Sequence, residues 1–196
     1  MAAYKLLLLP ADPLSSPLDC EQLATELQTM QLIGPPVALG ENVFYPAGEQ
    51  FLQQISFLGC SPMIELEPPT DPAQRADDST AGKFCHVFLH CHPVPGLRAD
   101  SQSPAPRCPQ CSQPLADWQA VRTDWLQNGV PTDWSCSHCG HQHQAAGLSF
   151  RKAAGIAHTF IEIRGIYPSE AVPTDALLKR LTQCSGGQWK TIYIKE

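Results

Sequence analysis

The chain has 196 residues, of which 43% are hydrophobic, and a formal net charge of -6. This hydrophobic content excludes a disordered chain, and the length fits one domain of ordinary size with a small appendage. The four leucines at residues 6–9 fall far short of the ~18 apolar residues that a membrane span needs, so neither a membrane segment nor a secretory signal is expected.

In the first part of the chain, residues 4–9 are typical of a short buried strand. The pair Ser16-Pro17 then predicts a helix start, and Gly34-Pro35-Pro36 predicts its end. Between them, apolar residues recur at helical spacing: Leu23, Leu27 and Met30. Three further elements are expected before the middle of the chain: a short helix over residues 51–58, a strand over 63–67 and a Pro/Asp-rich loop over 68–82.

Residues 83–92 are the next predicted strand, followed by a linker rich in Pro and Ser that runs to Pro106. Regular structure is expected to resume after residue 150, with a strand over 156–166, a helix capped by Thr174 that ends before Gly186, and a closing strand over 189–195.

These elements predict an α+β fold, a two-layer sandwich with its helices on one side of the sheet, for which a ferredoxin-like plan is the fold-level analogy. We expect residues 1–106 and 151–196 to form one discontinuous α+β domain. Residues 107–150 are then an inserted module.

The inserted segment carries two Cys-x-x-Cys pairs, which are Cys108 with Cys111 and Cys136 with Cys139. Each two-residue gap lets a tight turn aim both sulfurs at one ion, and four thiolates suit tetrahedral zinc. A segment of ~45 residues is near the lower limit for a self-sufficient hydrophobic core, so a bound metal would supply stability that the core lacks. We expect one structural Zn²⁺ held by these four cysteines.

The four cysteines, with Gly140 directly after the second pair, resemble the zinc-ribbon family over residues 107–150 only. Ser112 stands where a matching glycine would follow the first pair. The resemblance implies a structural zinc in a module that contacts protein or nucleic acid. The alternative is a redox dithiol, because Cys108-Pro-Gln-Cys111 resembles a glutaredoxin-type motif. That motif begins a helix after a strand, whereas a proline-rich linker precedes it here.

Histidines and tryptophans crowd the same segment. One histidine could replace a cysteine as ligand, or several could form a second site, but we favour solvated side chains on a polar hairpin for His138, His141 and His143. We expect the tryptophans to roof the metal and fill the gap to the main sheet, with at least one exposed enough to bind a partner: Trp118, Trp125 and Trp134.

The strand at residues 83–92 holds the other cluster of metal-binding residue types. Period-two geometry puts Cys85, Val87, Leu89 and Cys91 on one face, and His86, Phe88, His90 and His92 on the other. The favoured interpretation is a buried apolar face and a half-exposed histidine face. The alternative is a metal-dependent enzyme that uses His86, His90 and His92.

Other catalytic signals are weak. The chain lacks a zinc-protease, phosphate-loop, nucleophile-elbow or dinucleotide-binding motif. Glu162 and Arg164 are expected to form a surface salt bridge rather than an acid–base pair. Cysteines outside the quartet are expected to be thiols of a reducing cytosol, and three are interpreted as core fillers: Cys20, Cys60 and Cys184.

The distribution of charge along the chain indicates which class of partner the protein could bind. Residues 1–106 sum to -8, while residues 107–152 and 153–196 each sum to +1. No segment has the basic stripe that phosphate neutralisation requires. These observations favour a cytosolic, non-catalytic zinc protein whose ribbon presents a protein-binding surface. The nucleic-acid alternative would need the arginines of the ribbon to cluster beside an exposed tryptophan: Arg107, Arg122 and Arg151.

Overall fold

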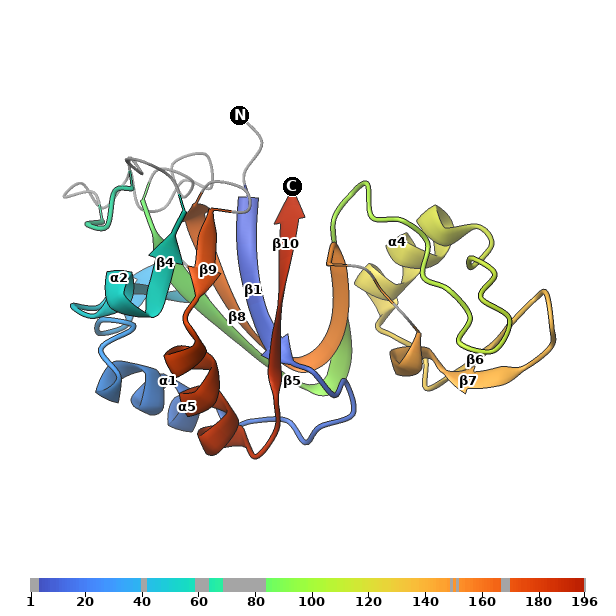
Figure 1. Ribbon diagram of the computed structural model, residues 1–196, viewed down its shortest axis with the longest axis horizontal. Helices are drawn as coiled ribbons and strands as arrows, with labels where there is room; N and C mark the ends of the chain where they lie inside the picture. Colours follow the sequence, from blue (N-terminus) through green and yellow to red (C-terminus); the bar gives the residue numbers. More distant parts are fainter. Residues whose placement is uncertain are drawn as a thin grey trace.

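The computed structural model describes residues 4–39, 42–58, 64–68, 84–148, 150, 152–166 and 170–195. Its main element is a six-stranded antiparallel sheet in the order β10-β1-β8-β5-β3-β2 (Figure 1). The strands are β1 (Tyr4–Pro10), β2 (Val37–Leu39), β3 (Asn42–Pro46), β5 (His86–Ala99), β8 (Ala154–Ile166) and β10 (Trp189–Lys195). With the helices described next, this sheet confirms the predicted α+β class.

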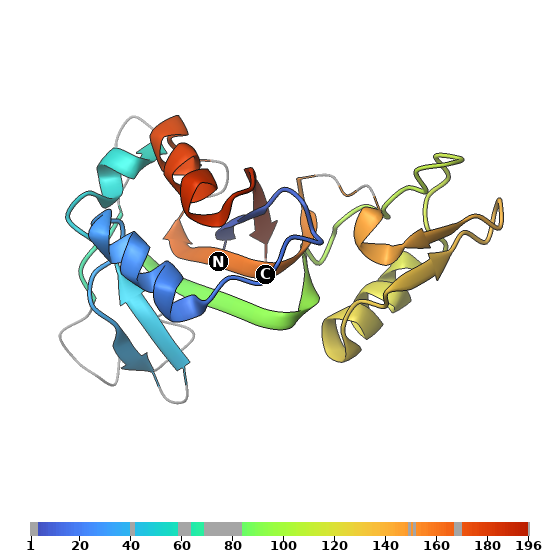
Figure 2. The ribbon, with the colours of Figure 1, turned by 90° about the horizontal axis from the view of Figure 1, so that it is seen from below.

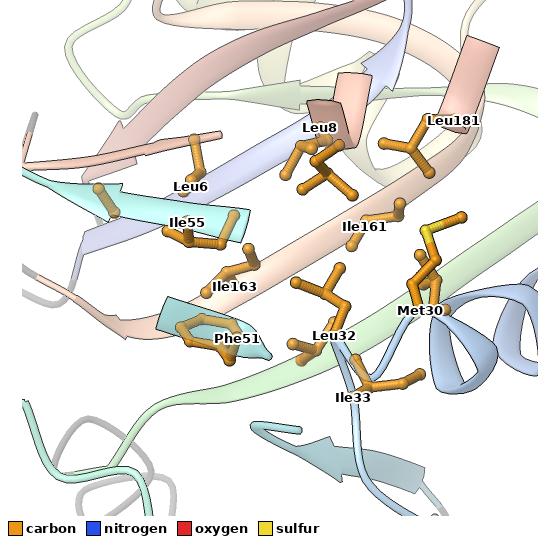
Figure 3. Packing of buried hydrophobic residues seen from close by; sticks show 14 of the residues in the cluster. Leu6, Leu8, Met30, Leu32, Ile33, Phe51, Ile55, Ile161, Ile163 and Leu181 are labelled. Atoms are coloured by element: carbon orange, nitrogen blue, oxygen red, sulfur yellow. The ribbon is translucent and has the colours of Figure 1, made fainter. Parts of the chain in front are cut away.

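Helices α1 (Cys20–Thr29) and α5 (Asp175–Ser185) lie on the same face of this sheet (Figures 1 and 2). Alternate residues of the central strands point to this face, so Leu6, Leu8, Ile161 and Ile163 meet Leu181 of α5 in one apolar cluster (Figure 3). Burying each such side chain stabilises the fold by about 1.5–3 kcal/mol. This cluster is the main core.

The ferredoxin-like plan stays a prediction. Four strands lie in the order β10-β1-β8-β5, with α1 on the connection from β1 toward β5 and α5 between β8 and β10. Strands β3 and β2 extend the sheet beyond β5. The connection from β1 to β5 also contains α2 (Phe51–Gln54) and β4 (Ile55–Phe57).

The face of the sheet opposite these helices also buries apolar side chains. Leu7 and Leu9 of β1 pack with Phe160 of β8 and with Ile192 and Ile194 of β10. Figure 2 shows β5 and β8 curving together along their length. The backbone N–H of Tyr193 in β10 donates to the carbonyl of Lys152, just before β8, at 3.1 Å. The curvature therefore brings the start of β8 back to the edge strand and covers this second cluster.

Capping residues set the ends of both long helices. Thr174 caps α5 as predicted, because its hydroxyl accepts a hydrogen bond from the Leu177 N–H at 3.3 Å. The prediction of Ser16 as the first cap is wrong: α1 begins after Asp19, whose carboxylate accepts from the Gln22 N–H at 2.8 Å. The Leu18 N–H donates to the Thr159 hydroxyl, which ties the chain before α1 to β8.

The predicted helix over residues 51–58 is only partly correct. It is one turn, α2 (Phe51–Gln54), which passes directly into β4 (Ile55–Phe57). Strand β4 pairs with the distant β9 (Ala171–Pro173), and this long-range pairing overrides the local helical spacing. Met63 lies outside the described residues, and residues 64–68 form no strand, although the Cys85 N–H donates to the Glu65 carbonyl. The hairpin of β2 and β3 was not predicted.

The predicted linker from Pro93 to Pro106 is wrong at its start, because β5 continues to Ala99. Pro93 and Pro95 lie within an irregularity of the ladder with β8, between Cys91 and Gly96. Proline cannot donate a ladder hydrogen bond, so it is tolerated at such a break. The prolines therefore bend the strand and do not end it.

The cysteines outside the quartet correct two predictions. Cys20 and Cys91 form a disulfide between the start of α1 and β5, so neither is a free thiol and Cys20 is not a core filler. Cys184 is exposed rather than buried. Cys85 is fully buried, and burial raises the pKa of its thiol to about 12. Cys60 lies outside the described residues.

Residues 100–150 project from the ends of β5 and β8 as a separate group of elements, at the right of Figures 1 and 2. They comprise α4 (Trp118–Asn128), β6 (Asp133–Ser135), β7 (Gln142–Gln144) and the 3₁₀ turn η1 (Ala145–Gly147). Their apolar core includes Leu97 of β5 and Ile156 of β8. The division into a sheet domain and a module at residues 107–150 stays a prediction. None of the helices in the described part of the chain is long and apolar enough to cross a membrane.

Candidate metal centre

The first Cys-x-x-Cys pair forms a tight knuckle. The Cys108 N–H donates to the Gln113 carbonyl at 2.9 Å, and the Ser112 N–H donates back to the Cys108 carbonyl at 2.9 Å. An isolated bridge between Arg107 and Pro114 closes the base of this loop. To complete the turn, Ser112 adopts a left-handed backbone with φ 59°.

The second pair repeats the same hydrogen bonds. The Cys136 N–H donates to the His141 carbonyl at 2.9 Å, and the Gly140 N–H donates to the Cys136 carbonyl at 2.8 Å. Here the ladder of β6 and β7 closes the base, and Gly140 has φ 70°. The two knuckles are thus equivalent in backbone structure, as expected of segments that present two sulfurs each.

The two knuckles bring all four sulfurs together. The Sγ atoms of Cys108, Cys111, Cys136 and Cys139 lie within 4.8 Å of one another. Cys108 and Cys139 are 3.9 Å apart at Sγ, and Cys111 and Cys136 are 3.7 Å apart. A tetrahedral ion with metal–sulfur bonds of ~2.3 Å needs neighbouring sulfurs ~3.8 Å apart. The quartet therefore fits one metal ion.

The backbone also influences the charge of these thiols. Backbone N–H groups of Cys139 and His138 point at the Cys136 sulfur and lower its pKa to about 7. The Gln113 N–H acts in the same direction on Cys111, but burial and the neighbouring thiols outweigh it and raise the pKa of Cys111 to about 12. The backbone of the second knuckle therefore favours the thiolate form of Cys136.

The three histidines near the second knuckle differ in position. His138 and His141 are exposed, as the favoured interpretation required. His143 is half-buried, and its Nε2 lies 3.3 Å from the Cys108 sulfur. Burial and the neighbouring His141 lower the pKa of His143. One histidine of the three therefore touches the quartet, a contact that its position in the sequence did not reveal.

Two of the three tryptophans are core residues. Trp118 and Trp125 pack edge to face on α4, with ring centroids 6.0 Å apart, in the cluster that includes Leu97 and Ile156 of the main sheet. The Trp118 indole N–H donates to the Ser103 carbonyl at 3.0 Å. They fill the gap to the sheet, as predicted. Trp134 is the partly exposed one and stacks on His143.

The arginines of the module make hydrogen bonds within their own segments. The Arg107 guanidinium donates to the Ser112 carbonyl at 2.8 Å, and the Arg122 guanidinium donates to the Gln119 side chain at 3.3 Å. Arg151 lies outside the described residues. These contacts give no support to a cluster of arginines beside Trp134.

The histidines of β5 lie on one face of the sheet, as predicted, since the rings of His86, Phe88, His90 and His92 contact one another in sequence. His86 is not half-exposed, however. It is 1% exposed and its Nδ1–H donates to the Phe84 carbonyl at 2.9 Å. Burial lowers the pKa of His86 to about 4.

His90 is engaged by a buried ionic cluster. Its Nε2 lies 2.8 Å from the Glu162 carboxylate, which also pairs with Lys5 at 3.1 Å and with Arg164. Burial alone would raise the pKa of Glu162, but these three basic neighbours hold it well below its usual range. Glu162 and Arg164 thus form the predicted ion pair, although the carboxylate is buried and not at the surface.

Within the described ranges, only the four cysteines bring three or more metal-binding side chains of Cys, His, Asp or Glu together. The face of His86, His90 and His92 forms no such group there. A comparison of the chain with protein families, with curated proteins and with solved structures finds no match.

Proposed function

We propose that Cys108, Cys111, Cys136 and Cys139 bind one Zn²⁺ ion in a structural role. The observation that carries this is the convergence of two equivalent knuckles on four sulfurs within 4.8 Å. Four thiolates favour zinc or iron, and a site closed by four protein ligands is typical of structural zinc. The ion would order a segment whose own apolar core is small.

The zinc assignment is tested by elemental analysis of protein purified without added metal. We expect about one zinc per chain and little iron. One equivalent of iron, or no bound metal in protein purified under reducing conditions, would contradict it.

We further propose that the module at residues 107–150 presents a binding surface for another protein. Trp134 is partly exposed beside the second knuckle, and Leu126 is 44% exposed on α4. Aromatic and apolar side chains of this kind anchor protein interfaces. Arg107 and Arg122, the two arginines of the module that the structure describes, hydrogen-bond within their own segments, which favours protein over nucleic acid.

This proposal is tested with a photo-crosslinking residue placed at Leu126, and with one at Leu14, an exposed leucine of the sheet domain, as control. We expect crosslinks from position 126 to a defined protein, and their loss in a Cys136→Ser background. Equal crosslinking from both positions would contradict the surface. Crosslinks that disappear with nuclease, or salt-sensitive binding to oligonucleotides, would assign nucleic acid instead.

We also propose a cytosolic location, because a thiolate quartet needs reduced cysteines. Cell fractionation tests this location. Recovery of the protein with a cytosolic marker would support the proposal, and recovery in the medium or within a membrane-enclosed compartment would contradict it.

A further inference from the structure

The side chain of His143 also reaches the sulfur cluster. The His143 Nε2 lies 3.3 Å from Cys108 Sγ, within hydrogen-bonding reach of a sulfur acceptor. Cys108 is 1% exposed, so water has little access to its sulfur. A buried thiolate without a hydrogen-bond donor is costly, and a donor from the protein offsets this cost.

The ring of His143 is held in place by its neighbours. His143 in β7 stands opposite Trp134 in the ladder with β6, and the two rings stack with centroids 5.9 Å apart and planes 17° apart. The His141 ring packs against it with a centroid distance of 4.3 Å. These contacts aim Nε2 at Cys108 by way of the β6–β7 hairpin.

The sulfur of Cys136, which is also buried, has different hydrogen-bond donors. Backbone N–H groups of Cys139 and His138 point at Cys136, whereas Cys108 faces an imidazole. A centre of four thiolates around one divalent cation carries a net charge of -2, so each donor to a sulfur stabilises it. The His143 contact therefore provides a donor to Cys108, the cysteine of the four that is most shielded from water.

We propose that His143 is a positioning residue of the metal centre, whose Nε2–H donates to the Cys108 thiolate and slows departure of the ion. The inference rests on the proposed zinc site. His143 carries its proton on Nε2 in this arrangement and is not itself a ligand. Trp134 acts one step further out, by fixing the orientation of the imidazole.

The test compares His143→Phe, which keeps a ring on Trp134 but removes the donor, with His92→Phe as the control, the same substitution on β5 outside the metal centre. The measurement is the rate of zinc transfer to a chromogenic chelator. We expect His143→Phe to retain one zinc per chain and release it about tenfold faster, and His92→Phe to release it at the wild-type rate. Trp134→Leu, which keeps His143 but frees its ring, should give an intermediate rate.

Three outcomes would overturn the inference. Release from His143→Phe and Trp134→Leu at the wild-type rate would show that the contact has no effect on the ion. A change of the cobalt-substituted spectrum from nitrogen-containing to all-sulfur coordination in His143→Phe would make His143 a ligand. Wild-type protein without zinc would remove the proposed site itself, which is visible before any variant is made.

Discussion

Ser112 and Gly140 occupy the same position in the two knuckles, and both adopt a left-handed backbone, with φ 59° and 70°. The N–H of each donates to the carbonyl of the first cysteine of its pair. Glycine takes this conformation freely, whereas a residue with a Cβ is destabilised there by about 1–2 kcal/mol. The two knuckles therefore differ in conformational energy although they match in structure.

This relationship predicts opposite effects for reciprocal substitutions. Ser112→Gly should stabilise the zinc-bound protein by about 0.5–1 kcal/mol, after the greater freedom of glycine in the unfolded chain is subtracted. Gly140→Ser should destabilise it by a similar amount, since a Cβ at Gly140 meets nothing within 4 Å and the effect is one of backbone strain alone. Urea unfolding followed by tryptophan fluorescence measures both. Destabilisation by both substitutions would indicate that the Ser112 side chain makes a stabilising contact.

Loss of one metal ligand should loosen the module. Cys136→Ser is expected to lose the metal and to raise hydrogen exchange across residues 107–148, because the ion is proposed to hold both knuckles. The effect should reach the ends of β5 and β8, since Leu97 and Ile156 belong to the same apolar core. Cys184→Ser, at an exposed cysteine outside the quartet, is the control. Full metal retention in Cys136→Ser would contradict the ligand assignment.

The disulfide between Cys20 and Cys91 should stabilise the packing of α1 on the six-stranded sheet. It closes a loop of 71 residues, for which the loss of chain entropy in the unfolded state is worth about 4 kcal/mol. The double variant Cys20→Ala/Cys91→Ala should therefore unfold at lower urea concentration than the wild type in the absence of reductant. In the presence of reductant, the urea midpoints of the variant and the wild type should become similar. Equal midpoints without reductant would show that the bond does not form.

The buried Glu162 predicts sensitivity to acid. Its pKa is lowered in the folded state, so its contribution is complete above the unfolded value of about 4.3 and is lost as the pH falls below that value. Glu162→Gln should destabilise the protein by about 3 kcal/mol at pH 7, because Lys5 and Arg164 lose their shared carboxylate. The exposed Glu67→Gln is the control, with an expected change near zero. A similarly small change in Glu162→Gln would show that the cluster is energetically neutral.

His86 predicts a second pH dependence, at higher pH. The pKa of the folded side chain is about 4 and that of the unfolded one about 6.5, so between these values only the unfolded state binds the proton. Stability should fall as the pH falls through this window, by about 3 kcal/mol in total. His86→Phe, which suits the surrounding rings of Phe44, Phe84 and Phe88, should flatten the slope. Urea unfolding of the wild type and of His86→Phe from pH 7 to pH 4.5 measures the dependence of stability on pH. Equal dependence in the two proteins would contradict a lowered pKa of His86.

What the sequence predicted correctly is local in character. The spacing within each cysteine pair predicts the metal site. Likewise, Thr174 predicts the start of α5 from one helical turn, and the alternation of apolar residues predicts β10 from one strand. Helix α4 was missed because it is polar on most sides. Its signal is Trp118 and Trp125, which lie two turns apart and share one face.

The features that the sequence did not reveal depend on distant partners. Residues 55–57 become a strand only because β9 lies beside them, and Cys20 meets Cys91 only after α1 has packed on β5. The left-handed backbone of Ser112 and the contact of His143 with Cys108 both follow from the three-dimensional loop. The spacing of residues in the sequence does not predict strand β4, the disulfide, the backbone of Ser112 or the contact of His143.

The position of the module between β5 and β8 has a consequence for the rate of folding. Ala99 and Ala154 pair in the ladder at the centre of the sheet, yet 54 residues separate them in the chain. Closing so long a loop costs about 2 kcal/mol more than closing a tight hairpin turn, and this cost falls on the step that pairs the two longest strands. A module already folded around its ion would bring its two ends together, as the hydrogen bond from the Asp100 N–H to the Ala153 carbonyl at 2.8 Å shows in the native state. Zinc present at the start of refolding should therefore speed formation of the sheet, and zinc added after the sheet has formed should not.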